Sequence, residues 1–203
     1  VDFAPGETAA TVTVVVVGDT LDEVDETVTL AVSSPVNADL GDAEGTGTIL
    51  DDDAPPSLTI ADATVGEGDA GTAVLSFDVT LDVPSGRTIS VAYASADGTA
   101  TAGDDYTAAS GTLSIDPGAT AATIEVEVLG DTLDEADETL TVTLSTPDAV
   151  TLADTGATGT IQDDDDAPSL TSEAVSVTEG DADNVTASFE LVLSASSART
   201  VTV

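Results

Sequence analysis

Carboxylates are the side chains of this sequence best able to bind a metal ion or transfer a proton. The chain contains 40 Asp and Glu residues, only two Lys and Arg residues, and neither His nor Cys. Without His, the commonest general base and the usual zinc ligand are missing, and without Cys there are no thiolate ligands and no disulfides. Only oxygen ligands remain, and these suit hard cations such as Ca²⁺ or Mg²⁺.

The acidic residues gather at four places: Glu67, Asp104–Asp105, the loop 131–138 and the run Asp163–Asp165. Two carboxylates ~4 Å apart repel each other by about 4 kcal/mol at an effective dielectric near 20. Several such pairs at one end of a domain would therefore separate unless cations lay between them. Ca²⁺ accepts six to eight oxygens in irregular geometry, whereas Mg²⁺ requires a stricter octahedron, so Ca²⁺ fits such a cluster better.

Spacing within the clusters predicts which side chains share a site. Glu135 and Glu138 are three residues apart, so one helical turn would present both to one side. Asp163 and Asp165 lie on one face of a strand, and Asp164 points to the other face. A simpler interpretation, in which these acids are solvated surface groups that keep the protein soluble, stays open on charge alone.

An internal repeat favours the specific interpretation. Residues 18–35 (GDTLDEVDETVTLAVSSP) recur at 130–147 (GDTLDEADETLTVTLSTP), an offset of 112 residues, and the same offset relates the Asp runs 51–53 and 163–165. A repeat of this length is a whole domain. Other surface positions differ between the copies, whereas GDTLDE and DDD are unchanged.

The repeat also predicts the domain organisation, with boundaries at two short acidic joints that contain proline. We expect these residues to be a part of a longer tandem array. The predicted units are the second half of a repeat at 1–53, a linker at 54–56, a complete repeat at 57–165, a linker at 166–168, and the first third of another repeat at 169–203.

Apolar residues alternate with polar ones in the complete repeat, which is the period of β-strands. Turn signals such as Asp97-Gly98 and Pro117-Gly118 separate the runs, and no segment has a sustained helical period. About seven short strands in ~110 residues predict an all-β, immunoglobulin-like antiparallel sandwich. The predicted strands are 58–60, 73–81, 88–94, 112–115, 122–129, 139–144 and 159–162. The predicted core is aliphatic and includes Val79, Leu81, Val91, Ile124, Val126, Val142 and Leu144.

Composition excludes several classes of function. A net charge of −38 repels nucleic acid, whose recognition requires Lys and Arg, and it repels anionic membrane surfaces. No run of about 18 apolar residues predicts a membrane span. No hydrolytic triad can be built without His, and a carboxylate pair for glycoside hydrolysis would lack the aromatic platforms that such sites offer. We therefore expect a protein that is not an enzyme.

Three motifs in the complete repeat together resemble the Calx-β domain family. They are DGTATAGDDY at 97–106, SGTLSIDPGATAATIEVEVLGDTLDEADETLTVTL at 110–144 and GTIQDDD at 159–165. The resemblance extends over essentially the whole chain and implies a seven-stranded sandwich that binds several Ca²⁺ ions at one pole. The ligands that it implies are Glu67, Asp105, Asp131, the carbonyl of Leu133, Glu135, Glu138, Asp163, Asp164 and Asp165. The matching residues of the first partial repeat are Asp19, Leu21, Glu23, Glu26, Asp51, Asp52 and Asp53, and that of the last is Glu179.

The sequence departs from the family pattern at one position of each loop. Calcium-rich members have a further Asp where this chain has Gly130 and Gly18. This difference removes one carboxylate from each site, so the resemblance does not imply a full cluster of four ions.

The expected function is structural. Tandem sandwiches with short acidic linkers and Ca²⁺ at each joint would form a stiff extracellular rod, stalk or filament in a large adhesin-like or surface protein. The expected partners are neighbouring repeats and other copies in a filament, since residues 1–56 and 169–203 are complementary parts of one repeat. Two alternatives stay open: an adhesion module that grips a receptor or glycan, and a Ca²⁺-sensing regulatory domain, as in sodium–calcium exchangers.

The few basic and aromatic residues have simpler interpretations. Arg87 and Arg199 occupy equivalent positions of two repeats, where we expect ordinary edge charges; a salt bridge to a neighbouring repeat is the alternative. Tyr93 and Tyr106 are expected to pack in the core or at a corner of the sandwich.

Overall fold

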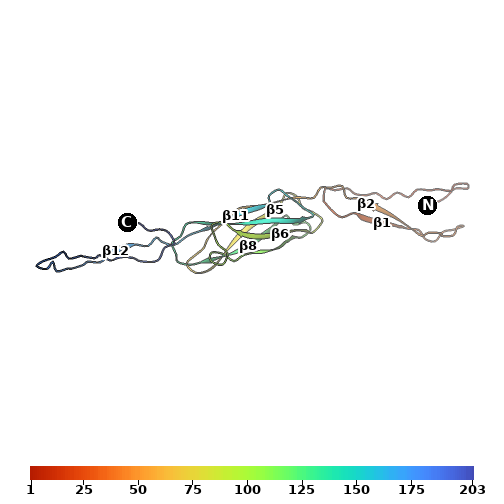
Figure 1. The fold of residues 1–203 in the computed structure, drawn as a ribbon. Coiled ribbons are helices and arrows are strands. Elements are labelled where there is room, and N and C mark those ends of the chain that lie inside the picture. The colour runs from red at the N-terminus through yellow and green to blue at the C-terminus, as the bar shows by residue number, and fades with distance from the viewer.

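The computed structural model describes all residues 1–203 and consists of strands and loops without helices. A membrane-spanning helix is accordingly not among its elements. The molecule is elongated, with a central sandwich and one extended segment at each end (Figure 1). The N-terminal segment contains the hairpin of β1 (Glu26–Ala31) and β2 (Glu44–Ile49), and the C-terminal segment contains β12 (Leu170–Ser172) and β13 (Leu191–Leu193).

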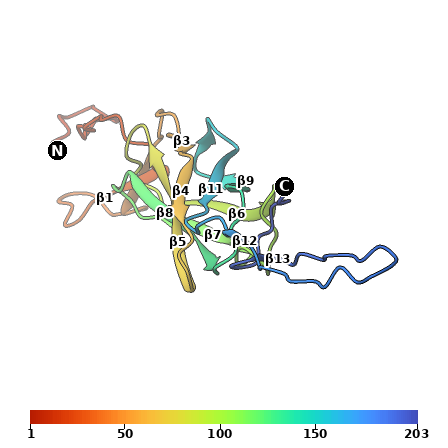
Figure 2. The ribbon, with the colours of Figure 1, turned by 90° about the vertical axis from the view of Figure 1, so that its left-hand side faces the viewer.

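Two sheets form the central sandwich, as the sequence predicts. Their strand orders are β10-β3-β5-β8 and β4-β11-β9-β6-β7, and their neighbours are mostly antiparallel. Figure 2 views the sandwich from one end of the molecule, between the two extended segments. The strands are β3 (Ser57–Ile60), β4 (Ala63–Gly66), β5 (Gly71–Leu81), β6 (Ile89–Asp97), β7 (Ser110–Ile115), β8 (Ala121–Gly130), β9 (Glu138–Asp148), β10 (Thr151–Leu152) and β11 (Gly156–Gln162).

The core forms because the strand period places every second side chain between the sheets. Along β5, Leu75, Phe77, Val79 and Leu81 are buried, and the residues between them are exposed. The core cluster comprises 20 residues between Leu58 and Ile161 and contains all seven of the predicted aliphatic residues. The 203 residues therefore contain one complete hydrophobic core.

All seven predicted strands are present, and two more were not predicted. β10 is only two residues long and extends the first sheet beside β3. β4 follows β3 after a two-residue break but belongs to the opposite sheet, where it pairs in parallel with β11. The first predicted strand is thus the first half of an edge that changes sheets, and the second half, β4, ends at Gly66, immediately before Glu67.

The flanking segments repeat the sequence of the sandwich without its burial. Val126 and Phe77 are 1% and 0% exposed in the central core, but their equivalents Val14 and Phe189 are 56% and 65% exposed. These side chains have no opposing sheet within the 203 residues. The hypothesis that two end segments complement each other between chains stays a prediction.

Tyr106 closes the loop between β6 and β7. The side chain is 1% exposed, and its hydroxyl donates a hydrogen bond of 2.7 Å to Asp97 Oδ1. Burial and this partner raise the pKa of Tyr106 to about 12, and the same hydrogen bond lowers the pKa of Asp97. Tyr93 is partly buried against the core. The interpretation of both tyrosines as packing residues is confirmed.

Replacing Tyr106→Phe should lower the free energy of unfolding by about 1.5–3 kcal/mol, because it removes a hydrogen bond to a charged carboxylate and leaves the packing unchanged. Urea denaturation measures the change. Tyr93→Phe is the matched control, because the Tyr93 hydroxyl makes no hydrogen bond like that of Tyr106 to Asp97. An equal loss in both variants would contradict a special role for the Tyr106 hydroxyl.

Candidate metal centre

One pole of the sandwich collects the acidic residues because of how β4 and β11 pair. The two strands are parallel with Gly66 opposite Gln162, so the residues that follow them, Glu67 and Asp163, leave the sheet at the same edge. The Glu67 N–H donates to the Gln162 carbonyl over 3.2 Å and continues this pairing. The loop between β8 and β9 and the loop between β6 and β7 reach the same pole.

Two clusters of three carboxylates form there. Within each cluster the nearest carboxylate oxygens all lie within 4.8 Å of one another. Negative groups at such separation repel strongly when partly buried, and a divalent cation between them reverses the sign of the interaction. The first cluster is Glu67, Asp163 and Asp165, and the second is Asp105, Glu135 and Glu138.

Backbone hydrogen bonds hold the acidic loops in place. Asp131 Oδ1 accepts from the Leu133 N–H (2.6 Å), which makes the start of the β8–β9 loop an Asx turn. Asp163 Oδ1 accepts from the Glu135 N–H (3.2 Å) and ties this loop to the end of β11. Asp105 Oδ2 accepts from the Thr101 N–H (2.6 Å). Each carboxylate retains a second oxygen for other ligands.

Burial in the first cluster indicates that a cation fits it. Glu67 is 6% exposed, and its Oε1 atom is buried without a hydrogen-bond partner, as is Asp165 Oδ2. Buried polar atoms are rarely unpaired in native proteins, and charged ones are paired or bound to metal. An oxygen-only set with two unpaired atoms suits Ca²⁺.

Proton affinity is raised at both clusters. Burial and the neighbouring carboxylates, Asp131 first, raise the pKa of Glu67 to about 7. Burial, and then the charge and hydrogen bond of Asp105, raise the pKa of Glu138 to about 7. The pKa values of Glu135 and Asp165 are also raised, with burial as the largest cause and neighbouring carboxylates next.

The metal-free chain should lose stability as the pH rises from 5 to 8. A raised pKa means that the folded state binds protons more tightly than the unfolded state. The stability that Glu67 and Glu138 gain from protonation is therefore complete below about pH 4.5 and is lost as the pH rises through about 7. Thermal melting of protein stripped of metal measures this. The double variant Glu67→Gln, Glu138→Gln should have a flatter profile, and a melting temperature that rises over this range would contradict the prediction.

The remaining predicted residues of the central repeat lie at the edge of the two clusters. Asp164 is exposed, whereas Asp163 and Asp165 are half-buried, and its Oδ1 accepts from the Gly68 N–H (3.1 Å). Leu133 is half-buried in the loop that carries Asp131. The predicted helical turn over Glu135 and Glu138 is wrong: no helix spans these residues, Glu138 begins β9, and both side chains cluster with Asp105.

The equivalent acidic loop of the N-terminal segment shares some of these features. Asp19 Oδ1 accepts from the Leu21 N–H (2.9 Å), as Asp131 does from Leu133. The pKa values of Glu23 and Asp53 are raised, by burial first and then by neighbouring carboxylates. A pocket of about 160 Å³ is lined by all seven of the predicted residues, namely Asp19, Leu21, Glu23, Glu26, Asp51, Asp52 and Asp53.

Glu179 is the one predicted residue that the structure does not place in a site. It is exposed in the extended C-terminal segment and belongs to neither acidic cluster. Its equivalent, Glu67, clusters with Asp163 and Asp165, and the residues equivalent to these two in the last repeat are not among the 203 residues.

Sequence reasoning missed two residues of the acidic loops. Asp22 and Asp134 are among the few buried polar side chains, with exposures of 5% and 6%, yet they belong to neither carboxylate cluster. They contact the basic residues of the following repeat. Arg87 lies 3.8 Å from Asp22, and Arg199 lies 3.7 Å from Asp134, so the expectation of ordinary edge charges is wrong. The sequence did contain a signal for these pairs: both the two aspartates and the two arginines are separated by the repeat length of 112 residues.

Comparison with known proteins identifies the family. The Calx-beta domain family model matches residues 1–54 and 51–166, so the chain belongs to the Calx-beta family. Calx-β domains are Ca²⁺-binding modules rather than catalytic domains, and the acidic clusters of this chain offer the oxygen ligands that Ca²⁺ takes. No curated protein matches the chain.

Solved structures of Calx domains are similar to parts of the chain. The apo-form Calx CBD1 domain is 31% identical, with 54% of this chain and 98% of that chain covered and a TM-score of 0.47. CBD12 from CALX1.2 is 31% identical (54% and 46% covered, TM-score 0.48), and the calcium binding domain CBD12 of CALX1.1 is 30% identical (60% and 53%, TM-score 0.48). The chain thus spans about half the length of the CBD12 structures.

Proposed function

We propose that this chain is part of an extracellular structural array in which Ca²⁺ stiffens the joints between tandem repeats. In this proposal the ligands are the clustered carboxylates at the pole of each repeat, with Asp131 and the Leu133 carbonyl completing the central site. The array forms a rod or stalk in a larger surface protein. Neighbouring repeats are the principal partners, and millimolar external Ca²⁺ suits sites of the weaker extracellular class.

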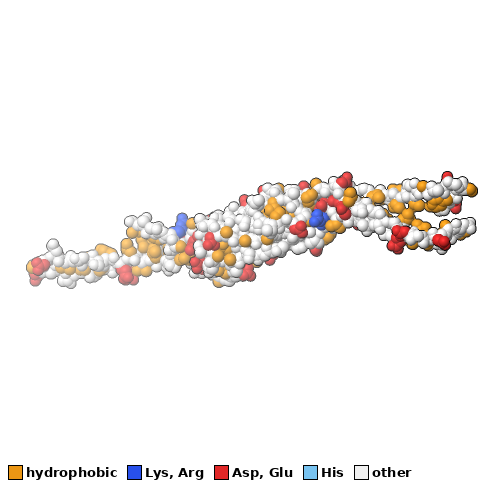
Figure 3. All heavy atoms as spheres, turned by 45° about the vertical axis from the view of Figure 1, so that its right-hand side comes forward, with side chains coloured by type: hydrophobic (Ala, Val, Ile, Leu, Met, Phe, Trp, Pro, Cys, Tyr) orange, Lys and Arg blue, Asp and Glu red, His pale blue; other side chains and the backbone are white.

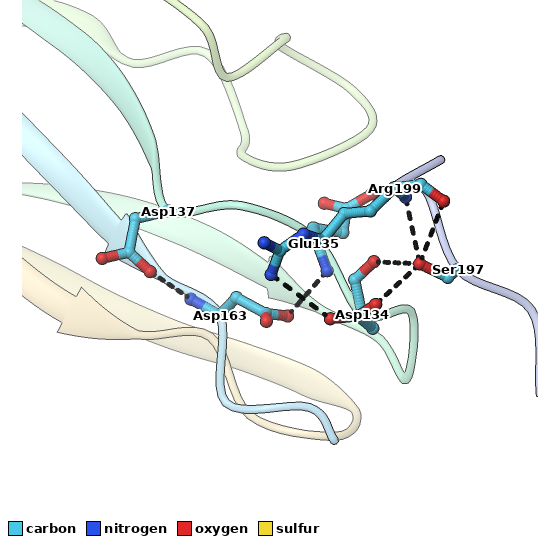
Figure 4. A network of polar contacts seen from close by, with 6 residues as sticks. All are labelled: Asp134, Glu135, Asp137, Asp163, Ser197 and Arg199. Carbon is cyan, nitrogen blue, oxygen red and sulfur yellow. Dashed lines mark hydrogen bonds and ion pairs between the residues drawn. The ribbon is translucent and has the colours of Figure 1, made fainter. Parts of the chain in front are cut away.

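The proposal rests on one observation: the pole of the sandwich that carries the two carboxylate clusters is also where the next repeat makes contact. Figure 4 shows polar contacts that run from Asp163 through Glu135 and Asp134 to Ser197 and Arg199 in the next repeat. Asp134 lies between two proposed ligands, the Leu133 carbonyl and Glu135. An ion that orders this loop therefore also orders the contact with the next repeat.

The run Asp163–Asp165 gives a second reason for stiffness. Asp163 and Asp165 belong to the first cluster, and the run is also the start of the connection to the next repeat. Ligands fixed by a cation hold the connection in one direction, whereas repelling carboxylates would favour many directions. The short joint then transmits the orientation of one sandwich to the next.

Small-angle X-ray scattering of the 203-residue chain tests the rod. Adding Ca²⁺ at fixed ionic strength should lengthen the largest dimension and sharpen the features of the distance distribution. Mg²⁺ at the same concentration is the control for charge screening and should have a smaller effect, because it gives up its water reluctantly. Equal flexibility with Ca²⁺ and with chelator would refute the rod while leaving Ca²⁺ binding itself intact.

A further inference from the structure

Both basic side chains of the chain lie where one repeat meets the next. The sequence contains only two Lys and Arg residues among 203. In Figure 3 the two blue groups lie near the two ends of the central body, close to red acidic groups. Each arginine pairs with an aspartate of the preceding repeat, and the two pairs are one repeat apart.

The first joint consists of more than an ion pair. Ser85 is 1% exposed, and its hydroxyl donates to Asp22 Oδ2 over 2.9 Å. The Gly86 N–H donates to the Asp22 carbonyl (2.9 Å), so both the backbone and the side chain of the aspartate are bound. Arg87 Nη1 lies 3.8 Å from Asp22 Oδ1. The arginine is 36% exposed and contributes less than the buried hydrogen bonds.

The second joint repeats this geometry at the same offset. The Ser197 hydroxyl donates to Asp134 Oδ2 (2.6 Å), and the Ala198 N–H donates to the Asp134 carbonyl (3.1 Å). Arg199 Nη1 lies 3.7 Å from Asp134 Oδ1 (Figure 4). Two independent joints therefore have the same donors, acceptors and spacing, although one has Gly86 where the other has Ala198.

We propose that the Ser-x-Arg segment of each repeat, Ser85–Arg87 and Ser197–Arg199, is a docking surface for the acidic loop of the preceding repeat. Its occupant is the buried aspartate of that loop, Asp22 or Asp134, and this contact sets the same orientation at every joint. The surface is specific because a strongly negative repeat repels its neighbours everywhere else. The inference rests on the proposed array. The docking contact itself contains no metal ion, so it can be tested separately from the calcium sites.

Spin-label distances across the first joint of the full chain test this surface. The chain has no Cys, so Thr29→Cys on β1 and Thr123→Cys on β8 can be labelled specifically at exposed positions. Double electron–electron resonance at saturating Ca²⁺ should give one narrow distance peak. Ser85→Ala should lose that peak in favour of a broad distribution, although Ser85 lies outside both acidic clusters and its loss removes no carboxylate.

The partner and the control complete the test. Asp22→Ala should broaden the distribution as Ser85→Ala does, and the double variant should be no broader than either one, because both remove the same contact. Ser197→Ala changes the equivalent residue of the other joint and should leave this distance unchanged. A narrow peak in both single variants, or equal broadening by Ser197→Ala, would overturn the docking surface without affecting the test of calcium binding.

Discussion

Chelation of Ca²⁺ at pH 8 and fixed ionic strength is expected to lower the melting temperature of this chain by a large amount. Ions that bind only the folded state add about 4 kcal/mol per site at a thousandfold excess over the dissociation constant. Each kcal/mol shifts the melting temperature of a domain of this size by roughly 4–8 °C, so one filled site accounts for roughly 15–30 °C. Thermal melting followed by circular dichroism, with Ca²⁺ and with chelator, measures the difference.

Two variants that change the net charge equally separate binding at the site from a general effect of charge. Glu67→Gln removes a carboxylate whose Oε1 atom is buried without a partner, so it should reduce the gain from Ca²⁺. It should not destabilise the metal-free chain, because it also removes repulsion from Asp131 and Glu135. Glu125→Gln on the exposed face of β8 should leave the gain from Ca²⁺ unchanged. A melting temperature that is the same with Ca²⁺ and with chelator would refute calcium-dependent stability.

The strands and the core were predictable because they depend on local pattern. Val79 and Val126 alternate with polar neighbours, and this period alone assigns them to the interior. The switch of β4 to the second sheet was not predictable, because four residues are too few to establish a period and parallel pairing has no local signal. That switch is what places Glu67 beside Asp163.

The candidate site was predictable in membership but not in arrangement. The acidic clusters included Glu67, Asp104–Asp105, the loop 131–138 and the Asp run; the repeat favoured the loop and the run, and the family resemblance assigned the individual ligands. Which acids face one another depends on three loops and a strand end that meet only in the fold. Asp134 shows the limit: its sequence context is that of a ligand, yet its side chain is turned to Ser197 of the next repeat.

The structure gives a physical reason for Gly130, the position at which this chain lacks the additional Asp of calcium-rich family members. Gly130, the last residue of β8, pairs with Gly71, the first residue of β5, and lies against the backbone of Glu67 and Gly68. A Cβ atom at Gly130 would lie 2.1 Å from the Gly68 carbonyl oxygen and 2.6 Å from that of Glu67. Both contacts are with backbone, which cannot rotate away as a side chain can. A side chain at position 130 therefore does not fit unless this backbone shifts.

Gly130→Asp should destabilise the chain by about 1–3 kcal/mol, the range for overpacking a well-packed position, and should weaken Ca²⁺ binding although it adds an acid. The clash displaces the backbone that holds Glu67, and losing the geometry of a buried ligand costs more than one additional negative charge supplies. Urea denaturation and calorimetric titration with Ca²⁺ measure the two effects.

Gly18→Asp is the matched control for this prediction, because it adds the same side chain at the same position of the other repeat, where no atom lies within 4 Å of the new Cβ. The residues equivalent to Glu67 and Gly68 are not part of the 203 residues at that site, so the clash is absent while the added charge is the same. Stability should therefore change little in Gly18→Asp. If Gly130→Asp instead bound more Ca²⁺ than the wild type without loss of stability, the Gly68 backbone would have to move readily, and the smaller ligand set would not follow from packing.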